Sequence, residues 1–425
     1  MVRLSCAILF LFAGAAKAQF LQFTAPGGPD GRPETAEQRL EREIEEAPYR
    51  LGPAYIAPVV GFRDAAYVRN LFASEEEATP SDVTVTFTAG LRAYLHTGRK
   101  VTWIAQAIPE YVWWNKREDD RRLNFSWGIG GVALFNRLTV DTAVSRAEHQ
   151  RIVTPEIPEL ANTASDLARL DAELEATSTL FPFVTARWTR QEALVEEHDD
   201  PRIEGLELLD REERVARAGL RWRPRPGWMI GLGVERSEID FDRVLLDSSN
   251  EGTSPVFEIQ IDRRRFFLAA DLAARSLKAS EGSLFVDYDG VTGSVSVSVL
   301  PRYRVEVWTY ANRDLVFSLS PDYPYLVDER IGLALVQRFG DRISTRVYGE
   351  TGGNDYVAFS RATRDRRDDL VAFGGSAQFL LTNTLTLAIQ ATRIEFDSNL
   401  PENNRSYTAG GLTLSLRGNL AGRNL

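Results

Sequence analysis

The residues best suited to chemistry in this sequence are charged side chains that recur among apolar ones, often at every second position. They carry both signs and are Arg92, Asp171, Glu173, Glu175, Arg217, Arg221, Arg223, Glu235, Arg304, Glu306, Arg338, Arg346 and Glu350. If they face a common interior, arginines opposite carboxylates create a transverse field and a polar constriction that selects solutes. The same pairs can instead neutralise one another and hold a wall together. The sequence leaves both interpretations open.

Catalytic and metal chemistry find little support in the sequence. His96 falls in an expected turn, and His149 and His198 fall in expected loops, so none shares a strand face with a serine two positions away. A Ser/His hydrolase site is therefore not expected. Residues 196–200 (Glu-Glu-His-Asp-Asp) read as a solvated acidic loop, with a divalent-cation site as the alternative. We expect no enzyme activity, no metal and no cofactor.

Composition excludes two broad classes. Hydrophobic residues make up 44% of the 425, mean hydropathy is -0.24, and no apolar run approaches the ~20 residues of a membrane helix. The formal net charge of -10 argues against nucleic-acid binding, which needs a basic surface. A β-barrel stays possible, because its strands need apolar residues only at every second position.

The first 54 residues divide into two expected segments. Residues 1–18 read as a secretory signal peptide, with Arg3, an apolar stretch over residues 4–15, and an Ala-Lys-Ala cleavage site at 16–18. A buried N-terminal helix is the alternative. Cys6, the only cysteine, lies in this segment, so disulfides are not expected in the mature chain. Residues 19–54 read as a periplasmic segment with a short helix within 34–46; a plug or partner-docking element is the alternative.

From residue 55 the pattern has a period of two. In residues 83–94, Val, Val, Phe, Ala, Leu and Ala share one face, whereas Thr, Thr, Thr, Gly, Arg and Tyr share the other. Similar strands recur, and they alternate short turns with long polar loops such as 148–165 and 195–214. Strands of about ten to thirteen residues suit a tilted membrane strand better than a soluble sandwich. A count gives about 18 strands (16–18) over residues 55–417, followed by a tail at 418–425, although residues 255–293 are ambiguous.

Tryptophans near the expected strand ends support this fold. Trp222 and Trp228 flank one short turn, and Trp113 and Trp114 stand where a strand meets a charged loop, as in an interfacial aromatic girdle. Arginines at 361, 364, 366 and 367, interleaved with aspartates, read as another charged extracellular loop. The predicted fold class is all-β: a transmembrane antiparallel β-barrel with short periplasmic turns and longer extracellular loops.

The sequence resembles a family of outer-membrane β-barrel porins found beside exopolysaccharide biosynthesis and export genes. The resemblance covers about residues 48–417 and rests on four segments: residues 52–56, 222–227, 289–295 and 407–416. It implies a large barrel that helps a polymer cross the outer membrane, and it supplies no catalytic residues. The chain departs from many barrels in lacking a terminal aromatic residue, since it ends on Leu425.

We therefore expect an outer-membrane channel of a Gram-negative-type bacterium that passes hydrophilic solute and assists exopolysaccharide export. A barrel this wide usually leaves an aqueous path unless a loop or terminal segment fills it. The alternative is a non-conducting structural or docking barrel with a plugged lumen. Expected partners are outer-membrane lipid and lipopolysaccharide, the barrel assembly machinery and polysaccharide export proteins, and nucleic acid is not among them.

Overall fold

The computed structural model describes residues 27–29, 32, 35–68, 82–116, 118, 121–151, 153–154, 156, 161–194, 205–320, 322–360, 362–382 and 385–416. The expected signal peptide, residues 69–81, the acidic loop at 196–200 with His198, and the expected tail lie outside these residues. In the residues described, no helix is long and apolar enough to cross a membrane.

The helix and strand bounds are α1 (Ala36–Glu46), β1 (Tyr49–Leu51), β2 (Ala54–Val68), β3 (Asp82–Thr97), β4 (Val101–Trp114), β5 (Arg122–Leu134), β6 (Leu138–Arg151), β7 (Ala161–Leu174), β8 (Leu180–Ala193), η3 (Gly205–Leu209), β9 (Arg211–Trp222), β10 (Trp228–Phe241), η4 (Val244–Leu246), β11 (Asn250–Arg263), β12 (Phe266–Ala279), β13 (Tyr288–Arg302), β14 (Val305–Ser320), β15 (Tyr323–Phe339), β16 (Ile343–Val357), β17 (Arg367–Leu380), β18 (Leu385–Ser398), η5 (Pro401–Asn403) and β19 (Arg405–Leu416).

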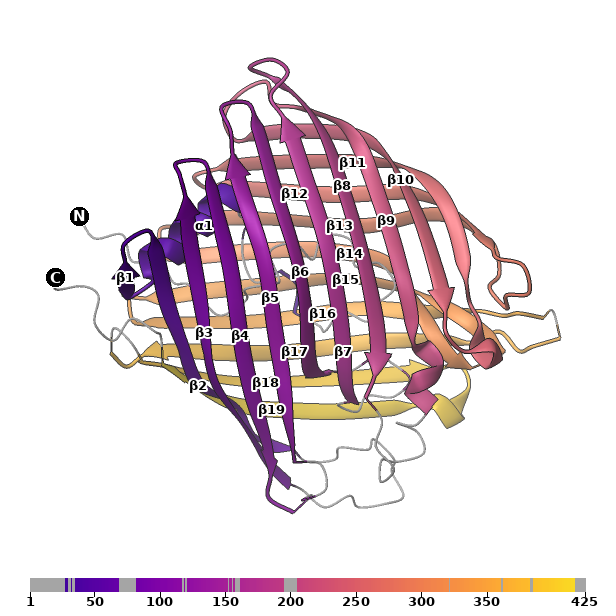
Figure 1. The fold of residues 1–425 in the computed structure, drawn as a ribbon. Coiled ribbons are helices and arrows are strands. Elements are labelled where there is room, and N and C mark those ends of the chain that lie inside the picture. Colours follow the sequence, from indigo (N-terminus) through magenta and orange to yellow (C-terminus); the bar gives the residue numbers. More distant parts are fainter. Residues whose placement is uncertain are drawn as a thin grey trace.

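Strands β2 to β19 form one closed antiparallel barrel of 18 strands, which confirms the predicted fold. Each strand pairs with its sequence neighbours, and β19 closes the sheet against β2 through pairs such as Leu414 with Phe62. The short β1 pairs with β2 at residues 54–56, on the periplasmic side of that closure. In Figure 1, β2 to β9 form the near wall and the strands from β12 onward the far wall.

The period-two alternation gives each strand one face toward lipid and one toward the interior. On β3, Phe87, Leu91 and Leu95 are exposed on the outer wall. Tyr94, on the opposite face, is buried against helix α1 inside the barrel. Closure gives every strand two partners, which a sheet surrounded by hydrocarbon requires.

The strands are longer than the membrane needs. They run from 12 residues in β9 and β19 to 17 in β15, against the nine to eleven that span a bilayer. The extra length lies on the side of the longer connections, so β6 and β7 reach Arg151 and Ala161 and shorten the expected 148–165 loop. His149 consequently lies in β6 and His96 at the end of β3, which corrects their expected loop and turn positions.

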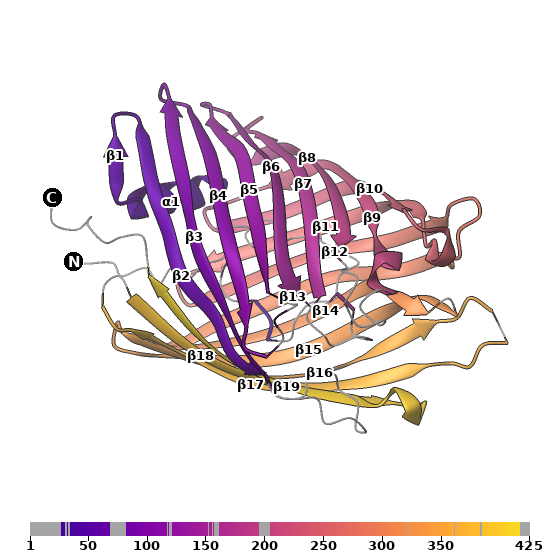
Figure 2. The same cartoon turned by 60° about the horizontal axis from the view of Figure 1, so that its bottom comes forward.

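Helix α1 lies inside the barrel rather than ahead of it. Thr35 caps the helix with a reciprocal capping box, and Ala36, Leu40 and Ile44 form one apolar stripe at helical spacing. That stripe packs on the inner face of the wall near the periplasmic turns, against Tyr94 and Val132. In Figure 2, the same helix lies behind β2 and β3, between the two walls. Of the two expectations for residues 19–54, a periplasmic segment or a plug, the contacts of α1 favour the plug.

Candidate functional site: the barrel lumen

The lumen wall carries a connected ion-pair network at the centre of strands β9 to β12. Arg217 Nη2 lies 2.8 Å from Glu235 Oε2, and Arg217 Nη1 lies 3.0 Å from both Glu258 Oε1 and Asp271 Oδ2. Glu235 also pairs with Arg275. Strand register explains the contact, since Arg217 and Glu235 are directly opposed across the β9–β10 pair. Glu235 has a fully buried side chain, so these charges compensate one another instead of facing open water.

The network continues toward the periplasmic end. Arg221 Nε lies 2.9 Å from Glu258 Oε2, and its Nη1 lies 3.0 Å from Glu173 Oε2. Arg223, just beyond β9, binds the same Glu173 at 2.6 Å. The guanidinium of Arg221 also stacks over the Phe183 ring, 3.9 Å from its centroid. On this side of the lumen the charged side chains therefore neutralise one another and hold the wall together, which is one of the two interpretations of the sequence.

Farther along the sheet, β14 to β16 hold the beginning of the N-terminal segment, of which the structure describes residues 27–29, 32 and 35–46. Glu350 accepts hydrogen bonds from the Gly27 backbone N–H (3.0 Å) and from the Tyr310 hydroxyl (2.9 Å). Arg346 donates to the backbone carbonyls of Gly27 and Pro29. Gly28 has a positive φ of 67° and lies against the Tyr310 ring so closely that a Cβ would collide with it. Arg346 and Glu350 therefore bind the chain's own backbone.

From there the described residues of the N-terminal segment first follow the same side of the barrel and then, with α1, reach the wall formed by β3, β5 and β6. Arg32 Nη1 lies 2.6 Å from Asp262 Oδ1 of β11, and its guanidinium sits over the Phe267 ring of β12. Arg39 on α1 then pairs with Asp141 of β6 at 2.6 Å, where Asp141 also accepts from Arg169. Contacts to β16, β11 and β6 together mean that the segment spans the interior.

Helix α1 also brings a buried carboxylate to the wall. The Glu43 side chain is buried between α1 and the inner face, and desolvation raises the pKa of its carboxyl. Arg39 and Arg92 oppose this effect, because nearby positive charge favours the ionised form. Arg92 also donates to Gln106 at 3.3 Å. The charged lumen residue Arg92 thus lies in the sector of the wall that α1 covers.

An apolar cluster lies at the extracellular mouth, on the side of the barrel formed by β7 to β15. It joins inner-face residues Val215 and Ile239 to Leu206 and Leu209 of η3, to Phe285, and to the tip of the β14–β15 hairpin. On that hairpin, Arg313 and Glu329 are exposed, whereas the next pair on the same face, Leu315 and Val327, is buried. The tip therefore turns into the mouth, where loops from β7 to β15 meet.

The Glu156 carboxylate joins the β6–β7 loop to this cluster. Glu156 accepts hydrogen bonds from the Ser318 hydroxyl and the Leu319 backbone N–H, both at 2.7 Å, and lies 3.8 Å from Arg366. Burial raises the pKa of the Glu156 carboxyl, and the two hydrogen bonds and Arg366 counteract it. Arg366 is itself buried and bonded to Asp368, so this arginine belongs to the mouth rather than to a solvated loop.

The structure places most of the predicted lumen residues on inner faces and a few at the rim. Inner-face residues are Arg92, Asp171, Glu173, Arg217, Arg221, Glu235, Glu306, Arg346 and Glu350. Arg223 and Arg338 lie at the periplasmic rim and contact Glu173 and Glu306. Glu175 and Arg304 are not wall residues, because β7 ends at Leu174 and β14 begins only at Val305.

Several charged lumen residues were not predicted from the sequence, and one predicted girdle tryptophan lies on the inner face instead. Glu258, Asp271 and Arg275 complete the network but lie in the 255–293 stretch, where strand bounds could not be assigned. Trp222 is exposed on the outer wall, and Trp228 and Trp113 lie on the same wall. Trp114 instead faces inward and is buried, because adjacent strand residues point to opposite faces, so it cannot join the girdle.

Solved structures with the same architecture are outer-membrane porins. A BenF-like porin from Pseudomonas fluorescens Pf-5 matches with a TM-score of 0.52 and 10% identity, covering 86% of this chain and 99% of that one. Pseudomonas aeruginosa OccK3 (OpdO) matches at 0.51 and 13%, covering 85% and 95%. Pseudomonas aeruginosa OccK2 (OpdF), solved in complex with glucuronate, matches at 0.50 and 11%, covering 86% and 99%. At these identities the likeness establishes the fold. No protein-family model and no curated protein matches the sequence.

Proposed function

We propose that this protein is an outer-membrane channel for hydrophilic solutes whose lumen is closed by its own N-terminal segment. One observation carries the proposal: an 18-strand barrel with a charged inner face holds the described residues of its N-terminal segment (27–29, 32 and 35–46) across its interior through ion pairs and hydrogen bonds. A barrel of this size is too wide for wall side chains alone to fill. Displacing the segment would leave a polar, water-accessible path.

The contacts that hold the segment are of a kind that can be released. Arg32 and Asp262 keep 25% and 45% of their side chains exposed, and exposed pairs contribute about 0–1 kcal/mol each. Arg39 with Asp141 and the Leu40 side chain form the more buried anchor. The wall network, in contrast, is closed on itself and does not depend on the segment.

The test is single-channel conductance of the refolded mature protein in a planar bilayer. Full-length protein should give small or rare steps, and deletion of residues 19–46 should raise the conductance. Leu40→Asp with Arg39→Ala should do the same, whereas Glu41→Ala, on the exposed face of α1, should not. Since the mouth cluster lies in series with the segment, Glu156→Ala in the deletion background should raise the current further.

The competing function is a non-conducting structural or partner-docking barrel. Two features favour it: the N-terminal segment packs inside the lumen, and an apolar cluster lies at the extracellular mouth. A correctly folded barrel that stays silent after both the deletion and Glu156→Ala would establish this alternative and overturn the channel proposal.

The finer proposal, assistance in exopolysaccharide export, rests on the sequence resemblance alone. It places the protein in the outer membrane beside polysaccharide export proteins, after insertion by the barrel assembly machinery. Deleting the gene and measuring secreted polymer tests it, and unchanged export would exclude the polymer while leaving a channel for small solutes intact.

A further inference from the structure

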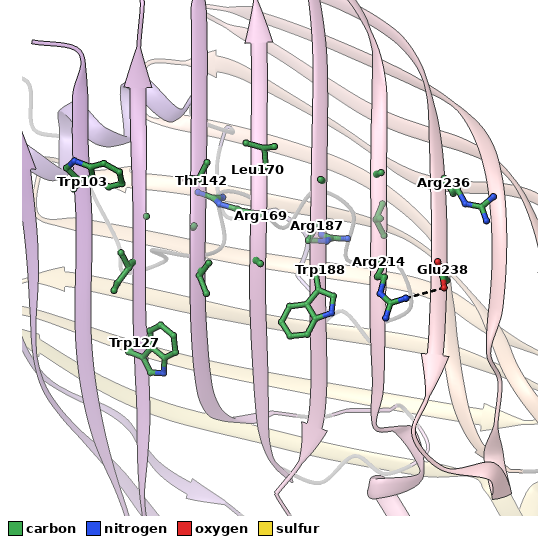
Figure 3. Close-up of a pocket in the computed structure, with 18 residues that line it drawn as sticks. Trp103, Trp127, Thr142, Arg169, Leu170, Arg187, Trp188, Arg214, Arg236 and Glu238 are labelled. Atoms are coloured by element: carbon green, nitrogen blue, oxygen red, sulfur yellow. Dashed lines mark hydrogen bonds and ion pairs between the residues drawn. The ribbon is translucent and has the colours of Figure 1, made fainter. Parts of the chain in front are cut away.

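The outer wall of the barrel between β4 and β10 is hollowed. A groove of about 880 Å³ lies there, lined on the lipid-facing side chiefly by small and aromatic residues. Its floor includes Ala168, Ala186 and Ala216 on the successive strands β7, β8 and β9, with Ala186 and Ala216 directly opposed. Trp103, Trp127 and Trp188 border it, as Figure 3 shows.

The groove lies where the apolar outer wall gives way to charge. Along β9 from the periplasmic end, the outward residues are Trp222, Leu220, Ala218 and Ala216, followed by Arg214 and Glu212. β10 changes one outward position earlier, from Val234 to Arg236, and Arg236 is directly opposed to Ala216. The apolar part of the groove is thus at acyl-chain depth, and its charged rim is at the extracellular headgroup level.

The rim offers donors that suit a phosphate. Arg214 is shared among Glu212, Glu238 and Asp240, and Figure 3 draws its contact with Glu238. Arg236, with 62% of its side chain exposed, uses Nη2 for Glu251 at 2.6 Å. Its Nε and Nη1 donors make no hydrogen bond among the residues that the structure describes, and each can donate singly to a phosphate oxygen.

We propose that this groove binds one acyl chain of lipid A, the phosphorylated and multiply acylated glycolipid of the outer leaflet, with a phosphate held by Arg236. A bare outer wall faces lipid everywhere, but only a groove of small residues lets a chain sink between flanking aromatic side chains and gain contact on several sides. Because the charged rim lies at the extracellular end of the groove, the bound lipid belongs to the outer leaflet. The Arg236 guanidinium favours a lipid with a phosphorylated headgroup. The inference rests on the proposed outer-membrane location and is independent of conduction.

The experiment is native mass spectrometry of the full mature barrel in detergent, with purified lipid A as the probe. Ala216→Phe and Ala186→Phe fill the groove; Ala274→Phe, at an exposed outer position of β12, is the matched control. We expect groove filling to lower lipid A occupancy about tenfold, equivalent to ~1.4 kcal/mol, and the control to leave it unchanged. Heat-modifiable mobility on gels confirms that each variant is folded.

The phosphate contact needs its own comparison. Arg236→Gln should weaken lipid A binding, and dephosphorylated lipid A should bind the wild type and Arg236→Gln alike. Arg393→Gln is the control, because Arg393 is an exposed outer arginine on β18 that pairs, within the described part of the chain, with Glu395 on its own strand. Equal occupancy in Ala216→Phe and Ala274→Phe overturns the proposal. So does a change of oligomeric state in the groove variants with unchanged lipid binding, which would make this face a contact between two copies of the chain.

Discussion

Replacing Glu235 with glutamine tests whether the lumen network is structural. Glu235 is fully buried and bridges Arg217 and Arg275, so Glu235→Gln keeps the shape but removes the charge that compensates both guanidinium groups. Removing one partner of a buried ion pair costs about 3–5 kcal/mol. Arg217 keeps Glu258 and Asp271, and Arg275 keeps the Thr292 hydroxyl at 3.0 Å, so we expect the lower end, about 3 kcal/mol.

The matched control lies on the same strand. Glu238 faces outward, keeps 42% of its side chain exposed, and pairs with an Arg214 that is 52% exposed. Such a pair contributes about 0–1 kcal/mol, so Glu238→Gln should have little effect. The comparison therefore separates an inner wall held by charge from an outer rim on which the same residue types interact weakly.

The assay is reversible urea unfolding of the protein refolded into lipid vesicles, followed by tryptophan fluorescence. About 3 kcal/mol corresponds to roughly a hundredfold rise in the unfolded fraction, because 1.4 kcal/mol is a factor of ten. Glu235→Gln should shift the midpoint clearly and Glu238→Gln should not. Equal midpoints for the two variants would refute the reasoning that the inner network stabilises the barrel.

Three further predictions concern backbone, pH and the mouth. Gly293 has a φ of 144°, and an added Cβ would collide with the Asp271 carbonyl. Gly293→Ala should therefore destabilise the β12–β13 pairing by about 1–3 kcal/mol, measured by urea unfolding. Gly349→Ala is the control and should have no such effect, because an added Cβ there meets open space. Burial raises the pKa of Asp210 to about 6, against the hydrogen bond from the Ala193 backbone N–H and with help from Glu192 and Glu207. The native state then binds the proton more tightly than the unfolded one, so this contribution is present below about pH 4 and is lost as pH rises through 6. The hydrogen-exchange protection factor of η3, which is corrected for the intrinsic pH dependence of amide exchange, should be higher at pH 5 than at pH 7, and Asp210→Asn should remove that difference. Glu156→Ala removes the carboxylate that accepts hydrogen bonds from the Ser318 hydroxyl and the Leu319 N–H. Limited proteolysis should then cut the β6–β7 loop faster than in Glu402→Ala, which changes an exposed loop residue and serves as the control. Equal cutting rates in the two variants would contradict the proposed role of Glu156 in holding this loop.

The strand number was predictable because lipid imposes a sharp rule on every outward position. Residues 83–94 of β3 alternate without exception, and their assigned faces are those of the structure. The rule weakens above the membrane, where both faces of a strand can be polar, and this hid the extensions of β6 and β7. It also failed between β11 and β12, which are joined only by Arg264 and Arg265, without the glycine, proline or asparagine that usually marks a turn.

The site was predictable in part for the same reason. Inner-face charges could be assigned on well-patterned strands such as β9, but their partners Glu258 and Asp271 lay in the ambiguous stretch. The apolar stripe of Ala36, Leu40 and Ile44 is visible in the sequence. Its binding surface is not, because Tyr94 and Val132 come from two strands brought together only by barrel closure.

The two sets of interior ion pairs differ in a way that assigns them different roles. Arg217, Glu235 and Arg330 have side chains less than a tenth exposed, and each has two or more charged partners, so losing one contact weakens the compensation of a buried charge without removing it. Among the described residues, the crossing segment includes the more exposed ion pair of Arg32 with Asp262. Wall and segment should thus respond differently to force, ionic strength or a competing ligand. Salt screens the exposed pair first, so opening by release of the N-terminal segment costs less free energy than any opening that deforms the barrel.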